Sequence, residues 1–133
     1  MVITLIICTF YSCKKDYEKY PQKWQLTTMS GQIANVLVKG TALPWQEYYL
    51  LNADGTFIKS REQNGVLTEV SGKYSFEVLS NDKYLMLTYE TTNSIIGNGT
   101  SDLKEVLVVQ ADNTLFSSTA ASDGPALTYE KIE

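Results

Sequence analysis

Few residues in this chain are of the types that do chemistry, since it has no histidine and its two cysteines are Cys8 and Cys13. Histidine is the commonest general base, and a nucleophile needs such a base or a lowered pKa. The remaining options are a serine activated by a lysine, or a pair of carboxylates. Glu62 and Glu69 flank one predicted hairpin and could face each other across it. Acidic residues near strand ends are usually solvated, so we predict no catalytic residues and no enzyme activity.

Asn52, Asp54 and Gly55 match part of a calcium-binding loop, whose cage needs several oxygens and a bidentate glutamate. With Gly55 at the sixth position of such a loop, Leu50 takes the first position and Arg61 the last, and neither side chain can ligate calcium. A hairpin turn explains the same residues, because glycine adopts the positive φ of a tight turn at little cost. We therefore predict no metal site and no cofactor.

Cys13 follows twelve uncharged residues, mostly apolar from Val2 to Tyr11, and precedes the charged run Lys-Lys-Asp. The apolar run is about half of the roughly 20 residues that cross a bilayer, and it has the length of a signal-peptide core. With Ser12 as the small residue before the cysteine, the segment resembles the signals of bacterial lipoproteins. A free N-terminal strand with an incidental cysteine is the alternative.

The lipoprotein resemblance implies a signal peptide at residues 1–12 and lipid, diacylglycerol with palmitate, on Cys13. It places the protein in the cell envelope, anchored at the outer membrane and either periplasmic or surface-exposed. Residues 13–22 then form a polar tether that reaches roughly 30 Å at about 3.3 Å per residue. Residues 23–133 suffice for one domain. The net charge of -4 argues against a nucleic-acid partner, and we favour a monomer.

From Lys23 onward, short strand-like runs alternate with turn signals such as Asp54-Gly55 and Asn64-Gly65. Tyr74 and Phe76 alternate with polar residues, the period of a strand with one solvated face. Residues 83–89 and 105–110 are apolar on both faces, which predicts a strand covered on both sides or facing a ligand cavity. Residues 30–39 form a short helix or a further strand. The predicted strands are 23–28, 47–52, 56–62, 66–79, 83–89, 105–110, 113–119 and 127–132.

Eight short antiparallel strands in one domain fit a sandwich or an up-and-down barrel, which closes to remove exposed edges. Several segments are similar to lipocalin-like domains of bacterial lipoproteins, and the resemblance spans nearly all of residues 23–133. It implies an all-β, eight-stranded antiparallel up-and-down barrel that binds or carries a small apolar ligand. The segments are Lys23-Trp24-Gln25-Leu26, residues 48–57, Ser71-Gly72-Lys73-Tyr74 and residues 123–132.

Two functions remain open on this barrel. In the first, aromatic side chains line a cavity for a small hydrophobic ligand, although the same residues could be ordinary core. In the second, the barrel is filled and acts as an interaction module for an envelope protein, through two long loops that carry Trp45, Ile95 and Ile96. The candidate pocket residues are Trp24, Tyr49, Phe57, Tyr74, Phe76 and Tyr89.

Overall fold

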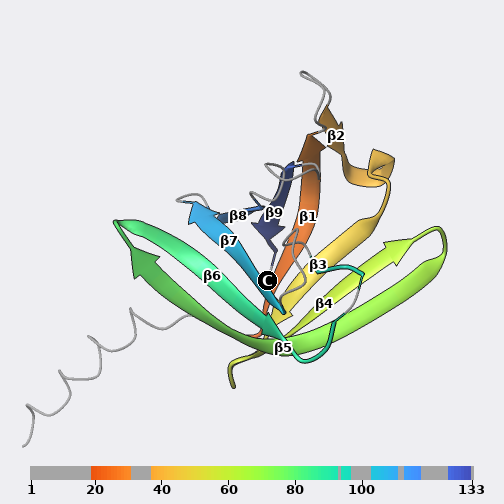
Figure 1. The fold of residues 1–133 in the computed structure, drawn as a ribbon. Helices are drawn as coiled ribbons and strands as arrows, with labels where there is room; N and C mark the ends of the chain where they lie inside the picture. The colour runs from red at the N-terminus through yellow and green to blue at the C-terminus, as the bar shows by residue number, and fades with distance from the viewer. Residues whose placement is uncertain are drawn as a thin grey trace, which may run out of the picture.

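The computed structural model describes residues 19–30, 37–92, 94–96, 103–110, 113–117 and 126–132. Eight of its strands close into an antiparallel up-and-down barrel, because the last strand pairs back onto the first (Figure 1). This confirms the all-β barrel predicted from the sequence. The strands are β1 (Gln22–Ser30), β2 (Leu37–Lys39), β3 (Gln46–Leu51), β4 (Thr56–Gln63), β5 (Val66–Leu79), β6 (Asp82–Tyr89), β7 (Lys104–Gln110), β8 (Thr114–Ser117) and β9 (Ala126–Lys131).

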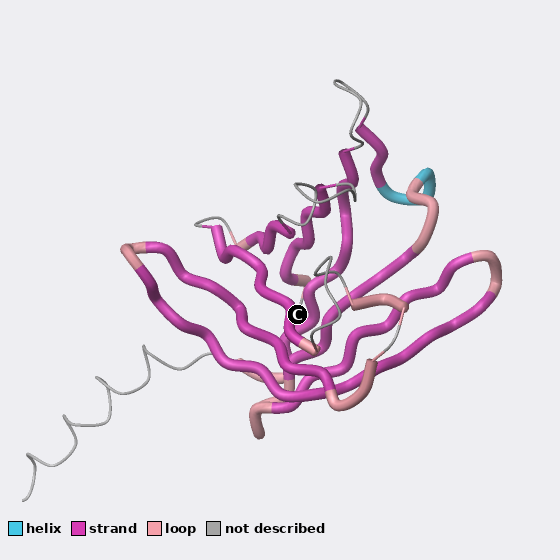
Figure 2. Tube along the Cα trace, viewed as in Figure 1, coloured by secondary structure: helices cyan, strands magenta, loops and turns pink. Residues whose placement is uncertain are grey.

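The predicted strands lie where alternation and turn chemistry placed them, with small shifts at their ends. β1 begins at Gln22, one residue earlier than expected, and the Gln22 side chain is buried and accepts a hydrogen bond from Trp24 Nε1 at 3.1 Å. Within 30–39, Ser30 ends β1 and the described residues 37–39 form strand β2, which pairs antiparallel with the end of β1 and is not one of the eight barrel strands. A single 3-10 turn, Gly40–Ala42, follows it and is the cyan segment in Figure 2.

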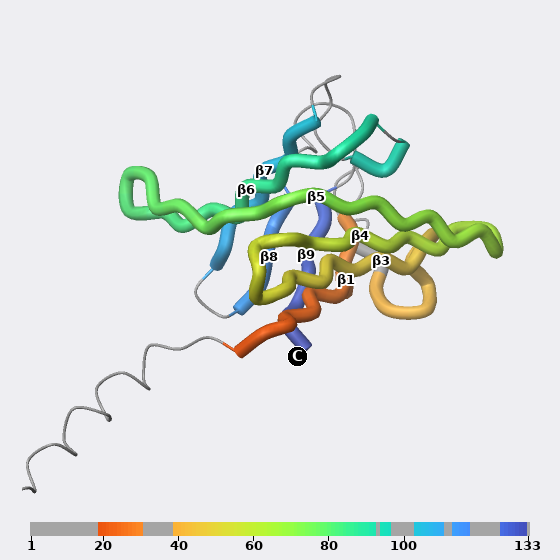
Figure 3. The backbone as a smooth tube through the Cα atoms, turned by 90° about the horizontal axis from the view of Figure 1, so that it is seen from below, coloured from red at the N-terminus to blue at the C-terminus, as the bar shows by residue number. Residues whose placement is uncertain are grey.

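Strand β5 is the longest and takes part in two hairpins that project beyond the barrel (Figures 1 and 3). Asn64 and Gly65 form the turn of the first, and Ser80 and Asn81 that of the second, all four with positive φ. We call these hairpins the far arm (β4–β5) and the near arm (β5–β6). The near end of the barrel is the one where Gln22 begins β1, and the far end is the opposite one.

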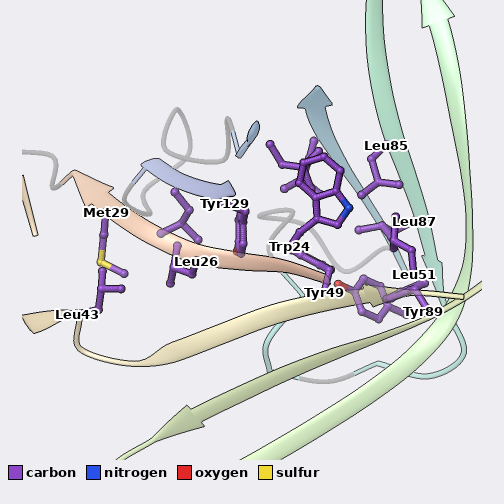
Figure 4. Packing of buried hydrophobic residues seen from close by; sticks show 14 residues of the cluster. Trp24, Leu26, Met29, Leu43, Tyr49, Leu51, Leu85, Leu87, Tyr89 and Tyr129 are labelled. Carbon is purple, nitrogen blue, oxygen red and sulfur yellow. The ribbon is translucent and has the colours of Figure 1, made fainter. Parts of the chain in front are cut away.

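The core is built from the inward-facing side chains of all eight barrel strands, several of which Figure 4 shows. Strand β6 alternates inward Leu85, Leu87 and Tyr89 with outward residues. The outward Val106 of β7 is 41% exposed, so the second face of these strands is not covered, contrary to one prediction. The apolar residues on that face are therefore part of the protein surface.

Candidate functional site

Several charged side chains point into the barrel interior because they occupy the same alternating strand positions as the inward apolar residues. On β3, Glu47 precedes the buried Tyr49 by two residues, and on β4, Lys59 follows Phe57 by two. On β7, Glu105 precedes Leu107 in the same way. Since alternate side chains of a strand share a face, these three charged residues point inward, and each is at most 3% exposed.

Glu105 accepts hydrogen bonds from three inward side chains. One of its oxygens accepts hydrogen bonds from the hydroxyl of Tyr49 at 2.7 Å and from the hydroxyl of Tyr89 at 2.5 Å. The other oxygen accepts a hydrogen bond from the ammonium of Lys59 at 3.3 Å. This carboxylate thereby joins β3, β4, β6 and β7 inside the barrel, and these three donors are held by strands.

Glu47 is the second buried carboxylate and is linked to two cations. Arg61 donates from Nε at 2.6 Å, and the Lys59 ammonium lies 3.7 Å away. The hydroxyl of Tyr129 on β9 also donates to Glu47. Two carboxylates and two cations therefore form one interior network whose formal charges sum to zero, and this pairing offsets the cost of burying them.

The network crosses the interior from wall to wall. Tyr49 on β3 and Glu105 on β7 lie on opposite sides of the barrel, with three strands between them in either direction. Edge-to-face aromatic contacts fill the space beside them, at 5.0 Å between the rings of Tyr49 and Tyr129 and 5.0 Å between those of Phe57 and Tyr89. The path that a ligand in the barrel would follow is occupied by these side chains.

The tyrosines of the network hold their phenolic protons strongly. Burial is the main cause that raises the pKa of Tyr49, Tyr89 and Tyr129 well above the ordinary value of 10.0. The neighbouring carboxylates are the second cause, Glu105 for Tyr49 and Tyr89, and Glu47 for Tyr129. The hydroxyls therefore act as donors and not as proton carriers near neutral pH.

The network is tied to the far end of the barrel at two points. The Lys59 ammonium donates to the backbone oxygen of Ile95 at 2.5 Å, which fixes the segment after β6 over the interior. The guanidinium carbon of Arg61 lies 4.3 Å from the ring centroid of Trp45, a cation–π contact. Among the described residues, Trp45 Nε1 is a buried side-chain donor without a hydrogen-bond partner.

The six candidate pocket residues all point into the barrel, and the structure divides them into three groups. Tyr49 and Tyr89 belong to the polar network, while Trp24 and Phe57 are buried in the core. Tyr74 and Phe76 are half-buried on β5 and contact each other with ring centroids 5.9 Å apart. The Tyr74 hydroxyl donates to the backbone oxygen of Asn52 at 2.7 Å, and burial raises its pKa.

The two loops predicted to contact a partner both lie at the far end. Trp45 precedes β3 and is half-buried against Arg61. Ile95 is 4% exposed and belongs to the segment after β6 that Lys59 holds over the interior. Its neighbour Ile96 is half-buried and packs against the core. The structure thus brings the two loops to one end of the barrel, with Ile96 and Trp45 as the more accessible members.

The Glu62 and Glu69 side chains share the outer face of the β4–β5 pair, but they do not oppose each other. In register, Glu69 lies opposite Ser60 and Glu62 opposite Leu67. Both glutamates are exposed to solvent. This is the arrangement of solvated surface carboxylates, the interpretation that the sequence favoured over a catalytic pair.

Asp54 is used by the turn between β3 and β4. Its carboxylate accepts hydrogen bonds from Thr56, from the backbone N at 3.0 Å and from Oγ1 at 2.6 Å, and these bonds lower its pKa. Gly55 has φ of +89°, which explains the glycine. The predicted hairpin turn is therefore present at this position.

Cys13 and the rest of the predicted signal lie outside the described residues. Lipidation at Cys13 therefore stays a prediction. Within the part of the chain that the structure describes, no helix has the length and apolar character needed to span a bilayer.

Sequence reasoning missed the charged members of the network, Glu47, Lys59, Arg61 and Glu105. The signal was their place in the alternation: Glu47, Lys59 and Glu105 each lie two residues from an inward apolar residue, and Arg61 lies four residues after Phe57 on the same face. A charged residue at an inward position of a small barrel needs a partner, so two anions and two cations in phase with the core indicate a buried network.

No family model matches the chain, and no curated protein or solved structure matches it either. The resemblance to lipocalin-like lipoproteins therefore stays a prediction, while the barrel itself stands on the strand pairing.

Proposed function

We propose that this protein is a filled barrel that works as an interaction module for another protein of the cell envelope. The observation that carries the proposal is the hydrogen bond from Tyr49 to Glu105 across the interior. Carriage of a small apolar ligand needs an open apolar lumen, and this lumen contains hydrogen-bonded and ion-paired side chains instead. Recognition is then a property of the outer surface.

The far end is the surface that best supports this proposal. It gathers two loops that are distant in sequence, and both are fastened to the interior network, through Arg61 to Trp45 and through Lys59 to Ile95. Rigid attachment lowers the entropy lost when loops bind a partner. Trp45 adds a half-buried aromatic side chain, and tryptophan is enriched among the residues that dominate protein interfaces.

Attachment to the membrane through lipid on Cys13 belongs to the same proposal. It rests on the resemblance of residues 1–13 to lipoprotein signals. A tethered module is confined close to the membrane, and this confinement raises its effective concentration toward partner proteins in the same envelope.

Cross-linking in envelope preparations tests the function. We expect a cross-linked band with a partner protein that Ile96→Asp and Trp45→Ala remove. The matched control is Val78→Asp on the near arm, an equally drastic change at a side chain that is 68% exposed, and it should leave the band unchanged. Circular dichroism establishes that each variant is folded.

Two results would contradict the proposal. A band that persists in both far-end variants removes this surface from the interaction. A small apolar molecule retained in stoichiometric amount by the purified chain, detected by native mass spectrometry, would favour carriage over protein recognition.

A further inference from the structure

The far arm carries an unpaired strand edge. On one side β5 pairs with β4 along its first eight residues, from Val66 to Lys73. On its other side, pairing with β6 begins only at Gly72. Among the described residues, no strand lies beside the Val66–Ser71 part of β5 on that side. An edge of this kind is a template for a further strand.

The backbone groups at this edge can be assigned from the neighbouring bonds. Ser71 accepts a hydrogen bond from the Glu90 backbone N at 3.1 Å, so its polar groups face the β6 side. Alternate residues of an antiparallel strand present N–H and C=O to the same side. Glu69 and Leu67 therefore present theirs to this edge, where their two N–H donors and two C=O acceptors face no strand of the described part of the chain.

A hollow of about 350 Å³ lies beside the edge, on the inner face of the far arm. Its lining residues are Arg61 and Gln63 of β4, Asn64 of the turn, Val66 and Thr68 of β5, and Ser94 and Ile95 after β6. Most of these residues are polar, Arg61 is the one cation among them, and Val66 and Ile95 are apolar. Glu47 receives the Arg61 Nε–H, and the guanidinium carries four further N–H donors on its terminal nitrogens.

The occupant is defined by these groups. A row of alternating backbone donors and acceptors is matched by an extended peptide and not by a compact small molecule. Arg61 lies directly opposite Thr68 in register. The residue of an added strand opposite Thr68 would lie on the same inner face, about 10 Å from Arg61 at two strand spacings. A glutamate there and Arg61 together span that distance.

We propose that the far arm binds an extended peptide segment of a partner protein by strand addition along Leu67 and Glu69, with an acidic side chain directed to Arg61. The proposal rests on the interaction function proposed above and specifies the partner's chemistry. The exposed Val66 and Leu67, at 63% and 62%, supply apolar contacts at the end of the added strand.

The near arm provides the comparison, since it also has an unpaired edge. Beyond Tyr74, no strand lies on the β4 side of β5 among the described residues. The Tyr74 N–H bonds to Gly55 on that side, so Val78 presents its backbone groups to the same edge. Glu77 at the middle of this edge is anionic and would disfavour an acidic peptide.

Nuclear magnetic resonance of the 15N-labelled full chain in detergent micelles tests the proposal. The probe is the pentapeptide acetyl-Thr-Val-Glu-Val-Thr-amide, and its twin has glutamine in place of glutamate. We expect the amide signals of Leu67 and Glu69 to shift and to gain protection from hydrogen exchange, while the near arm is unchanged. The glutamine twin should bind about tenfold more weakly, the loss of one charge-assisted contact.

Proline variants separate the edge from the rest of the surface. Leu67→Pro removes an edge N–H, and proline is tolerated at strand edges that face solvent. It should abolish the peptide-induced shifts, whereas the matched Val78→Pro on the near arm should preserve them. The exchange measurement uses the wild-type chain, so it stands even where a proline variant fails to fold.

Three outcomes overturn the proposal: no protection at Leu67 and Glu69 at millimolar peptide, equal binding of both peptides, or shifts concentrated on the near arm. The cross-linking result separates this failure from that of the proposed function. If the far-end variant Ile96→Asp still removes the partner band while the edge stays unprotected, the interaction function stands without strand addition.

Discussion

Lys59 and Glu105 form a 3.3 Å salt bridge inside the barrel, with 1% and 3% of their side chains exposed. Removing two charges from water costs several kcal/mol for each ion, and their attraction offsets this only when further hydrogen bonds satisfy the remaining groups. Here the tyrosine hydroxyls and the Ile95 carbonyl supply those bonds. The salt bridge is therefore tolerated as part of the network, and removal of either partner should destabilise the folded protein.

Replacing Lys59 by methionine should destabilise the protein by about 3–5 kcal/mol. The variant leaves the two buried carboxylates without the Lys59 ammonium, and it removes the hydrogen bond from Lys59 to the Ile95 backbone oxygen. The midpoint of urea unfolding measures the loss. Lys73→Met, on the outer face of β5, is the control and should change stability by less than about 0.5 kcal/mol. Equal midpoints for both variants would show that the network contributes nothing to stability.

Stability should fall as the pH rises above about 10, the pKa of an unfolded tyrosine. Tyr49, Tyr89 and Tyr129 have raised pKa values in the folded state, so the unfolded chain loses these protons first. Their contribution is complete below pH 10 and is lost above it, at about 1.4 kcal/mol per pH unit for each tyrosine.

Urea unfolding at pH 9, 10.5 and 11 follows this loss, and absorbance at 295 nm reports tyrosinate directly. Tyr89→Phe removes one of the three groups and should make the decline shallower by one tyrosine's share. A midpoint that does not change from pH 9 to 11 would mean that the buried hydroxyls ionise as easily as exposed ones.

Gly72→Ala should destabilise the barrel by about 1–3 kcal/mol or more. A Cβ at this position would lie 2.0 Å from the Thr88 backbone oxygen and 2.8 Å from the Tyr89 Cα, so strand β6 would have to move. Thermal unfolding measures the effect. Ser71→Ala, one residue earlier on the same strand, serves as the control and should unfold within a few degrees of the wild type.

Cys13→Ser should remove the protein from the membrane fraction and leave the barrel folded. The physical reason is that a serine cannot carry the thioether-linked diacylglycerol that the lipoprotein resemblance implies. Fractionation with immunodetection measures the location, and circular dichroism measures the fold. A variant that stays with the membrane refutes the anchor, and one that fails to fold places the N-terminal segment within the domain.

The fold was predictable because its signals are local. Alternation along Tyr74 to Val78 and the turns at Asp54-Gly55 and Asn64-Gly65 act over a few residues, and the strands lie there. The segment 30–39 was ambiguous because its strand is short and paired only at the end of β1. Its identity depends on a tertiary contact that local propensity does not contain.

The site was only partly predictable. Tyr49 and Tyr89 were recognised as inward residues, but their hydrogen bonds depend on Glu105, which comes from a strand 56 residues after Tyr49. Which inward charge meets which depends on the closure of the barrel and on its register. The free edge of β5 likewise depends on the residue at which the pairing of β5 with β6 ends. This residue is known only once both strands are placed in the fold.

The early start of β1 at Gln22 limits the length of chain between the barrel and the proposed lipid anchor at Cys13. Tyr20 packs against the core and Gln22 is buried, so the chain is already fixed to the barrel at Tyr20. Six residues separate Tyr20 from Cys13, a leash of roughly 25 Å when fully extended. If Cys13 carries the proposed lipid, this length would keep the near end close to the bilayer surface. The far arm, at the opposite end of the barrel, would then point toward the aqueous side, where it could reach soluble segments of neighbouring proteins.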